Sequence, residues 1–105
     1  MKKKKVPNPH GKLGSPKHRE KVNEVAKDIE KRGFLARLEY FIQLVSGKKR
    51  YVDVAALDYN LDEKEFHQIG KQTKSGIPVK RERDAIEEVY QAKGIKPQFH
   101  PYNKE

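Results

Sequence analysis

The sequence predicts a small single α/β domain (α+β) whose elements follow the order αβββαβ. Two segments carry apolar side chains at helical spacing, and the segments between them are rich in strand-forming residues that alternate or run together between short turns. A chain of 105 residues, of which 34% are hydrophobic, supplies one core near the lower limit of independent stability.

Composition and charge limit the classes of protein to consider. Twenty-four Lys and Arg residues against fifteen Asp and Glu residues give a net charge of +9, which favours nucleic acid or another polyanion as partner. The absence of cysteine excludes disulfides and thiolate metal sites. No apolar run approaches the ~18 residues of a membrane span, and Met1 to Lys5 is not followed by the apolar segment of a signal peptide. We therefore expect a cytoplasmic protein that does not enter membranes.

The chain begins with a basic segment and a helix. Residues 1–14 hold five lysines, two prolines and two glycines without periodicity, which predicts a flexible basic arm, and residues 15–105 are predicted to form the folded domain. Ser15 and Pro16 form an N-cap and first turn, and Gly33 a stop, so a helix is predicted from about 16 to 32. His18 falls at the edge of its buried stripe and Arg19 on the other flank, so His18 is either a structural histidine or a functional one. The buried stripe consists of Val22, Val25, Ala26 and Ile29.

Residues 34–45 alternate and predict a half-buried strand whose apolar face packs on the helix. Phe41 falls on its opposite face and is a candidate contact for a homodimer. Ser46 and Gly47 turn the chain into the next strand. The predicted apolar face consists of Phe34, Ala36, Leu38, Tyr40, Ile42 and Leu44.

Residues 49–71 predict a hairpin with one carboxylate, Asp53, inside an apolar run where an acid is costly. If Asn60 and Leu61 form the tip, paired residue numbers sum to 121, which places Asp53 opposite Gln68 on one face. A carboxylate and an amide oxygen are hard ligands suited to Mg²⁺. Alternatively, Asp53 lies at a sheet edge in water.

A loop, a second helix and a short edge strand complete the chain. The helix is predicted at about 80–93, with a stripe of Ala85, Ile86 and Val89, and the strand at 96–101. Cations that would grip nucleic-acid phosphates gather around the hairpin and this helix, with one more on the first helix. They are Arg19, Lys49, Arg50, Lys74, Arg81 and Arg83.

Four stretches, GSPKHRE, RYVDVAALD, HQIGKQTKSGIPVKRERDAI and FHPYN, together with the element order, resemble the restriction-endonuclease-like PD-(D/E)xK nucleases. That superfamily includes Holliday-junction resolvases and polymorphic-toxin nuclease domains, and the resemblance implies a mixed sheet with helices packed on it. It implies that Asp53 and Gln68 bind Mg²⁺ or Mn²⁺ and that Lys71 orients the attacking water. Relative to the family's Glu-x-Lys motif, Lys71 is displaced by one residue, which a bulge after Gly70 would correct. His18 occupies the place of the family's helix glutamate, where an imidazole could act as a base or bind phosphate.

A rival register would make Glu65 the metal-binding acid, but it places Glu65 opposite Asp58. The resemblance favours a metal-dependent DNA nuclease of the endonuclease or junction-resolvase type. The alternatives are a nucleic-acid-binding protein of the same fold without catalysis, and a basic module for the ribosome or a membrane surface in which Asp53 is incidental.

Overall fold

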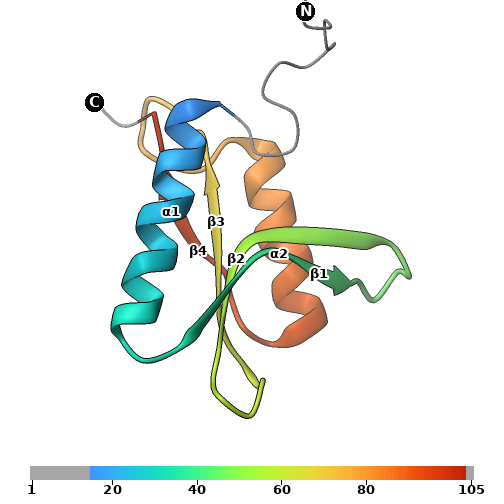
Figure 1. Ribbon diagram of the computed structural model, residues 1–105. Helices are drawn as coiled ribbons and strands as arrows, with labels where there is room; N and C mark the ends of the chain where they lie inside the picture. Colours follow the sequence, from blue (N-terminus) through green and yellow to red (C-terminus); the bar gives the residue numbers. More distant parts are fainter. Residues whose placement is uncertain (1–14, 104–105) are drawn as a thin grey trace, which may run out of the picture.

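The computed structural model describes residues 15–103, so the predicted arm at 1–14 lies outside the described residues. Its elements are α1 (Pro16–Lys31), β1 (Leu35–Gln43), β2 (Lys49–Leu57), β3 (Glu63–Gly70), α2 (Lys80–Lys93) and β4 (Gln98–Pro101). The strands form one sheet in the order β1-β2-β3-β4. The first three strands are antiparallel neighbours and β4 runs parallel to β3, so the sheet is mixed. The predicted fold class and element order are confirmed (Figure 1).

The two helices cover opposite faces of the sheet (Figure 1). Alternate residues of β2 supply both faces, since Val54 packs in the layer under α1 and Ala55 in the layer under α2. The layer under α1 contains Val22, Val25, Ile29, Val54, Ala56 and Ile69. The layer under α2 contains Ile42, Leu44, Val52, Ala55, Leu57, Phe66 and Val89.

Local chemistry explains where both helices begin and end. Ser15 Oγ accepts the His18 backbone N–H at 3.2 Å, and Pro16 opens α1 without a donor to satisfy. Gly94 follows α2 with φ of 74° and donates its N–H to the Tyr90 carbonyl at 2.8 Å. The observed bounds of α1 differ from the predicted ones by one residue, and those of α2 are as predicted.

The predicted single apolar face of β1 is wrong. Phe34 and Ala36 pack with the layer under α1, whereas Tyr40 packs with the layer under α2, and Leu38 between them is 48% exposed. The pairing of β1 with β2 keeps one register throughout but is interrupted at Glu39, which has φ of +48°. An unusual backbone conformation at Glu39 therefore rotates the rest of the hairpin toward the other face of the sheet.

The predicted register of β2 and β3 is confirmed where the strands pair. Ala55 lies opposite Phe66, as the sum of 121 requires, and a register shift follows only near the turn, between Ala56 and Leu57. The rival register is wrong, because Glu65 lies opposite Ala56 rather than Asp58. The described pairing ends at Val54 and does not reach Asp53, so the two strands separate at that acid.

The last strand is shorter than predicted but lies at a sheet edge, as its prolines require. After it, the Tyr102 N–H donates to the Gly70 carbonyl at 3.1 Å, and Asn103 bonds the backbone of Gln72. Within residues 15–103, neither helix has the length and apolar character that crossing a membrane would require.

Candidate active site

Asp53 lies where β2 and β3 separate, and its carboxylate bridges the gap. Its Oδ2 accepts the backbone N–H of Ile69 at 2.8 Å, while its Oδ1 lies 3.6 Å from Nε2 of His18 on α1. The side chain is 21% exposed. Burial raises the pKa of Asp53, and the Ile69 hydrogen bond and His18 oppose that rise only in part. This acid is therefore placed in the middle of the fold at an energetic cost.

A second acid, Glu82, lies beside it and was not predicted as a site residue. It comes from the first turn of α2 and is buried, and its Oε1 accepts a hydrogen bond from Gln68 Nε2 at 3.3 Å. Burial raises the pKa of Glu82, and the charge of Asp53 raises it further. The sequence did contain a signal, because Glu82 precedes Ala85 and Ile86 at the spacing of the buried stripe.

The predicted partnership of Asp53 with Gln68 takes a different form. Asp53 is held by the backbone of Ile69, the next residue along β3, while the Gln68 amide holds Glu82. The structure thus brings three oxygen-bearing side chains to one end of β3. The amide positions the second acid.

Gly70 stands at the position that the resemblance assigns to the catalytic lysine, and its surroundings leave no room for a side chain. A Cβ added at Gly70 would lie 2.5 Å from Glu82 Oε2, too close for any side chain unless Glu82 moves. The pairing of β3 with β4 reaches Gly70 without a register shift, so the predicted bulge is not part of the described pairing. Lys71 instead follows the end of β3 and lines the same cavity as Asp53 and Glu82.

The cavity has a volume of about 320 Å³ and is lined by residues from the N-terminal ends of both helices and from the end of β3. These three ends lie at the same side of the fold (Figure 1). Its walls include Ser15 and Val79, the N-cap residues of α1 and α2. Helix N-termini present unpaired N–H groups and a partial positive charge, so this cavity favours an anionic group above the two acids. Lys71 and Arg81, both exposed, line it as well. Tyr102 closes one side, with its ring edge-on to His18 at 5.5 Å.

The other predicted cations do not line this cavity. Arg19 lines an adjoining hollow of about 150 Å³ together with His18 and Asp53. Arg50 is paired with Glu88 of α2 at 2.7 Å. The remaining predicted cations, Lys49, Lys74 and Arg83, are exposed, and Arg83 donates to the Pro78 carbonyl at 2.8 Å.

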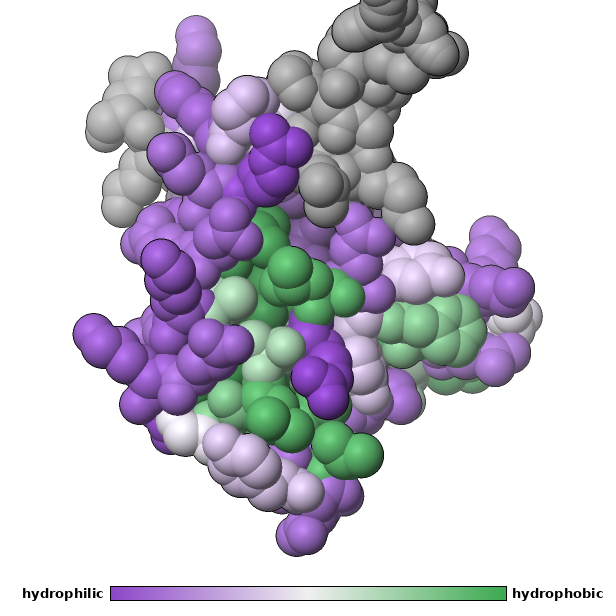
Figure 2. All heavy atoms as spheres, viewed as in Figure 1, coloured by the Kyte–Doolittle hydropathy of each residue, from purple (hydrophilic) through white to green (hydrophobic). Residues whose placement is uncertain are grey.

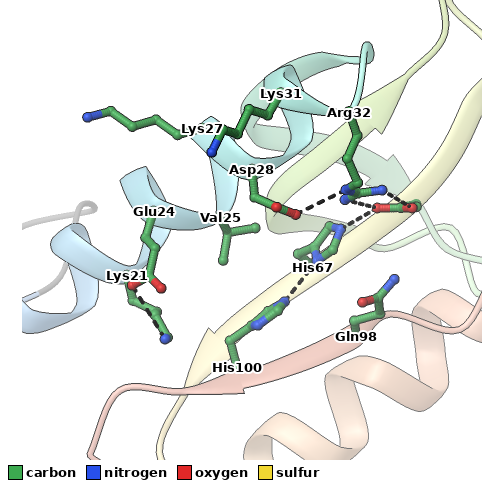
Figure 3. A pocket seen from close by; sticks show the side chains of 11 residues that line it. Lys21, Glu24, Val25, Lys27, Asp28, Lys31, Arg32, His67, Gln98 and His100 are labelled. Atoms are coloured by element: carbon green, nitrogen blue, oxygen red, sulfur yellow. Dashed lines mark hydrogen bonds and ion pairs between the residues drawn. The ribbon is translucent and has the colours of Figure 1, made fainter.

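A second cavity, of about 730 Å³, lies between α1 and the β3–β4 edge (Figure 3). A chain of hydrogen bonds crosses it. Arg32 bonds Asp28 and both carboxylate oxygens of Glu65, Glu65 bonds His67 Nε2 at 2.8 Å, and His67 Nδ1 lies 2.8 Å from His100 Nε2. Hydrogen bonds from Arg32 lower the pKa of Glu65 to about 2, so this ionised carboxylate accepts a hydrogen bond from His67 Nε2–H. Every member has a partner, and the chain ties α1, β3 and β4 together.

The donor set of the smaller cavity suits a hard divalent cation. No group of three His, Asp or Glu side chains arranged as metal ligands occurs within residues 15–103. Mg²⁺ does not require one, because it commonly binds through one or two carboxylates and completes its shell with water and substrate phosphate. The half-buried Asp53 and the buried Glu82 supply two carboxylates whose raised pKa values a cation would counteract. The residues present therefore fit Mg²⁺ or Mn²⁺.

Comparisons with family models, with curated proteins and with solved structures found no match for this chain. The resemblance to PD-(D/E)xK nucleases therefore stays a prediction. An assignment of function rests on the chemistry of the cavity that holds Asp53 and Glu82.

Proposed function

We propose that this protein is a Mg²⁺-dependent nuclease that hydrolyses phosphodiester bonds in DNA, with the cavity of Asp53 and Glu82 as its active site. The observation that carries the proposal is the placement of two acids from different elements, the buried Glu82 and the half-buried Asp53, beneath two helix N-termini. Acids alone would repel a phosphate, and cations alone would need no buried acids. Their combination suits a metal ion and a phosphate bound side by side.

Electrostatics supports a polyanionic substrate. The chain carries a net charge of +9, which attracts nucleic acid over long distances. Lys71 and Arg81 stand at the cavity, where they would contact the phosphates on either side of the scissile bond. Their exposure leaves both side chains able to reach a bound strand.

Each group of the site has a role in this proposal. Asp53 and Glu82 would hold the ion, and Gln68 keeps the Glu82 carboxylate turned toward the cavity. A bound divalent ion would lower the pKa of a water molecule and counter the charge that develops on the phosphate. His18 lies close enough to Asp53 to orient its carboxylate and, in its neutral form, to accept a proton from that water. Lys71 would stabilise the departing or attacking oxygen from beyond the strand end.

The test is a cleavage assay on supercoiled plasmid, linear duplex, single-stranded and junction DNA with Mg²⁺, Mn²⁺ or a chelator. Asp53→Asn and Glu82→Gln preserve size and hydrogen-bonding oxygens, so each is expected to lower cleavage at least about 100-fold with the fold intact. Glu87→Gln makes the same chemical change at an exposed position of α2 and should leave the rate unchanged. Metal-independent cleavage, or full activity of Asp53→Asn, would refute the proposal.

One observation favours a second candidate, a nucleic-acid-binding protein of the same fold without catalysis. The carboxyl of Glu82 occupies the space beside Gly70 that a side chain would need there, so the position that the resemblance assigns to the catalytic lysine holds no side chain. This candidate predicts salt-sensitive DNA binding with no cleavage in either metal. The same assay therefore separates the two candidates.

A further inference from the structure

Two aromatic side chains are exposed together on the outer part of the β1–β2 hairpin. Phe41 and Tyr51 lie opposite each other in the strand register, with ring centroids 5.7 Å apart in an edge-to-face arrangement. They are 43% and 54% exposed, so neither belongs to the core. Figure 2 shows apolar surface on this projecting end of the hairpin with hydrophilic side chains around it.

The pair shares a strand with the candidate active site. Tyr51 precedes Asp53 by two residues on β2, which is a step of about 6.5 Å along a regular strand. Lys49 precedes Tyr51 by the same step and pairs with Gln43. Lys49, Tyr51 and Asp53 therefore follow one another in this order along β2.

We propose that Phe41 and Tyr51 form a stacking platform for unpaired nucleobases next to the scissile phosphate, with Lys49 contacting the backbone of the same strand. This inference rests on the proposed function and names its substrate class, nucleic acid that is single-stranded or locally unpaired. Exposed aromatic rings bind bases through their faces, and bases inside a duplex do not offer theirs.

Charge and size favour a nucleic acid over a protein partner on this surface. About half of each ring is exposed, so the two rings offer roughly 100 Å² each, far below the roughly 800 Å² that each partner buries in a stable protein interface. The loop that ends the hairpin carries Lys48 beside Lys49, which would attract a phosphate backbone.

The test measures binding of a fluorescein-labelled 12-nucleotide single-stranded DNA and of its duplex, in a chelator so that no cleavage occurs. We expect the full-length protein to prefer the single strand. Phe41→Ala and Tyr51→Ala should each weaken single-strand binding about 5- to 140-fold, the range for loss of one stacked base, with little change for the duplex. Tyr51→Phe keeps the ring and should bind as the wild type does. Tyr59→Ala, at an exposed tyrosine in the β2–β3 turn, is the matched control and should have no effect.

The salt dependence separates stacking from charge. Lys49→Ala should reduce the slope of log affinity against log salt by about 0.7 for a single strand, whereas Tyr51→Ala should lower affinity without changing the slope. Wild-type binding by both alanine variants, or equal losses on duplex and single strand, would overturn the inference. A concentration-dependent dimer that Phe41→Ala dissociates, with DNA binding unchanged, would assign the surface to a second copy instead.

These outcomes are independent of catalysis. Ring-dependent binding without any metal-dependent cleavage would remove the proposed nuclease and keep the platform. Cleavage that requires Asp53 but is insensitive to Phe41→Ala and Tyr51→Ala would support the proposed nuclease and rule out the platform.

Discussion

Replacing Asp53 in two ways separates what its carboxylate does for the fold from what it does for chemistry. One carboxylate oxygen accepts the N–H of Ile69, a residue that is only 2% exposed. Asp53→Asn retains an oxygen that accepts this bond and removes the buried charge. Asp53→Ala removes the acceptor and leaves a buried donor without its partner.

The expected magnitudes follow from these contacts. A buried donor left without an acceptor costs about 1–3 kcal/mol, and each kcal/mol lowers Tm by about 4–8 °C in a domain of roughly this size. Asp53→Ala should therefore melt well below Asp53→Asn. The amide variant should in turn be more stable than the wild type at neutral pH, because burial raises the pKa of Asp53 and makes its ionisation harder in the folded chain than in the unfolded one.

The pH dependence of unfolding tests whether the Asp53 charge destabilises the fold. When an acid has a higher pKa in the folded than in the unfolded chain, the protein loses stability as the pH rises and the acid ionises. The greater stability of Asp53→Asn should therefore appear above pH 3.8, the ordinary pKa of Asp, and vanish below it. Urea unfolding of the three proteins across this range measures the difference. An alanine variant as stable as the amide variant would show that the Ile69 hydrogen bond contributes nothing, and an amide variant less stable than the wild type at neutral pH would refute the cost of the buried charge.

Three further predictions concern the neighbouring groups. Gly70→Ala should lower the stability of the fold by about 1–3 kcal/mol, because the new methyl group would overpack against the Glu82 carboxyl. The displaced carboxyl should also slow cleavage, and an unchanged melting curve and cleavage rate would contradict this prediction. Mg²⁺ at millimolar concentration should raise the Tm of the wild type through selective binding to the folded state but not that of Glu82→Gln, and an equal shift in both would place the ion elsewhere. Arg32 lowers the pKa of Glu65 from 4.5 to about 2, so the stability this pair provides is complete above pH 4.5 and is lost as the pH falls toward 2; Glu65→Gln should lose less stability over that range, and parallel curves for both proteins would argue against the ion pair.

The sequence was sufficient to predict the elements because local signals agreed with tertiary needs. Ser15, Pro16 and Gly94 mark helix ends by their own hydrogen-bonding and backbone preferences, and the structure uses them in that way. The predicted register of β2 with β3 holds from Val54 to Ala56, where Ala55 lies opposite Phe66. Next to the turn, Leu57 lies opposite Glu63, and this register shift was not predicted.

The faces of β1 were not predictable in the same way. Strict alternation assumes that a strand keeps its backbone conformation, and Glu39 departs from it with φ of +48°. Glu39 is not a residue type that signals such a conformation. The change of face follows from packing on two helices at once, which no local pattern of β1 contains.

Glu82 was missed because an acid in the first turn of a helix has a sufficient local explanation in the helix dipole. Its position on the buried stripe with Ala85 and Ile86 was the stronger signal. Asp53 was noticed because Asp is rare inside strands and no local feature of a strand favours a carboxylate. Strand pairing alone could not predict the partner of Gln68, because the pairing of β2 with β3 ends before Gln68. Its partner, Glu82, comes from α2 instead.

The contrast among three acids is what distinguishes the candidate site from ordinary structure. Glu65 is partly buried, but two hydrogen bonds from Arg32 and one from His67 satisfy it, and its pKa falls to about 2. Asp53 is as exposed as Glu65 and lies beside the buried Glu82, but the partners of these two acids oppose the effect of burial only in part, and the pKa of each rises. A chain with twenty-four Lys and Arg residues has no shortage of cations to pair with them. A core near the lower size limit gains no stability from two acids whose pKa values burial raises. Under the proposed function, a cation bound with the substrate is the partner that would offset this cost.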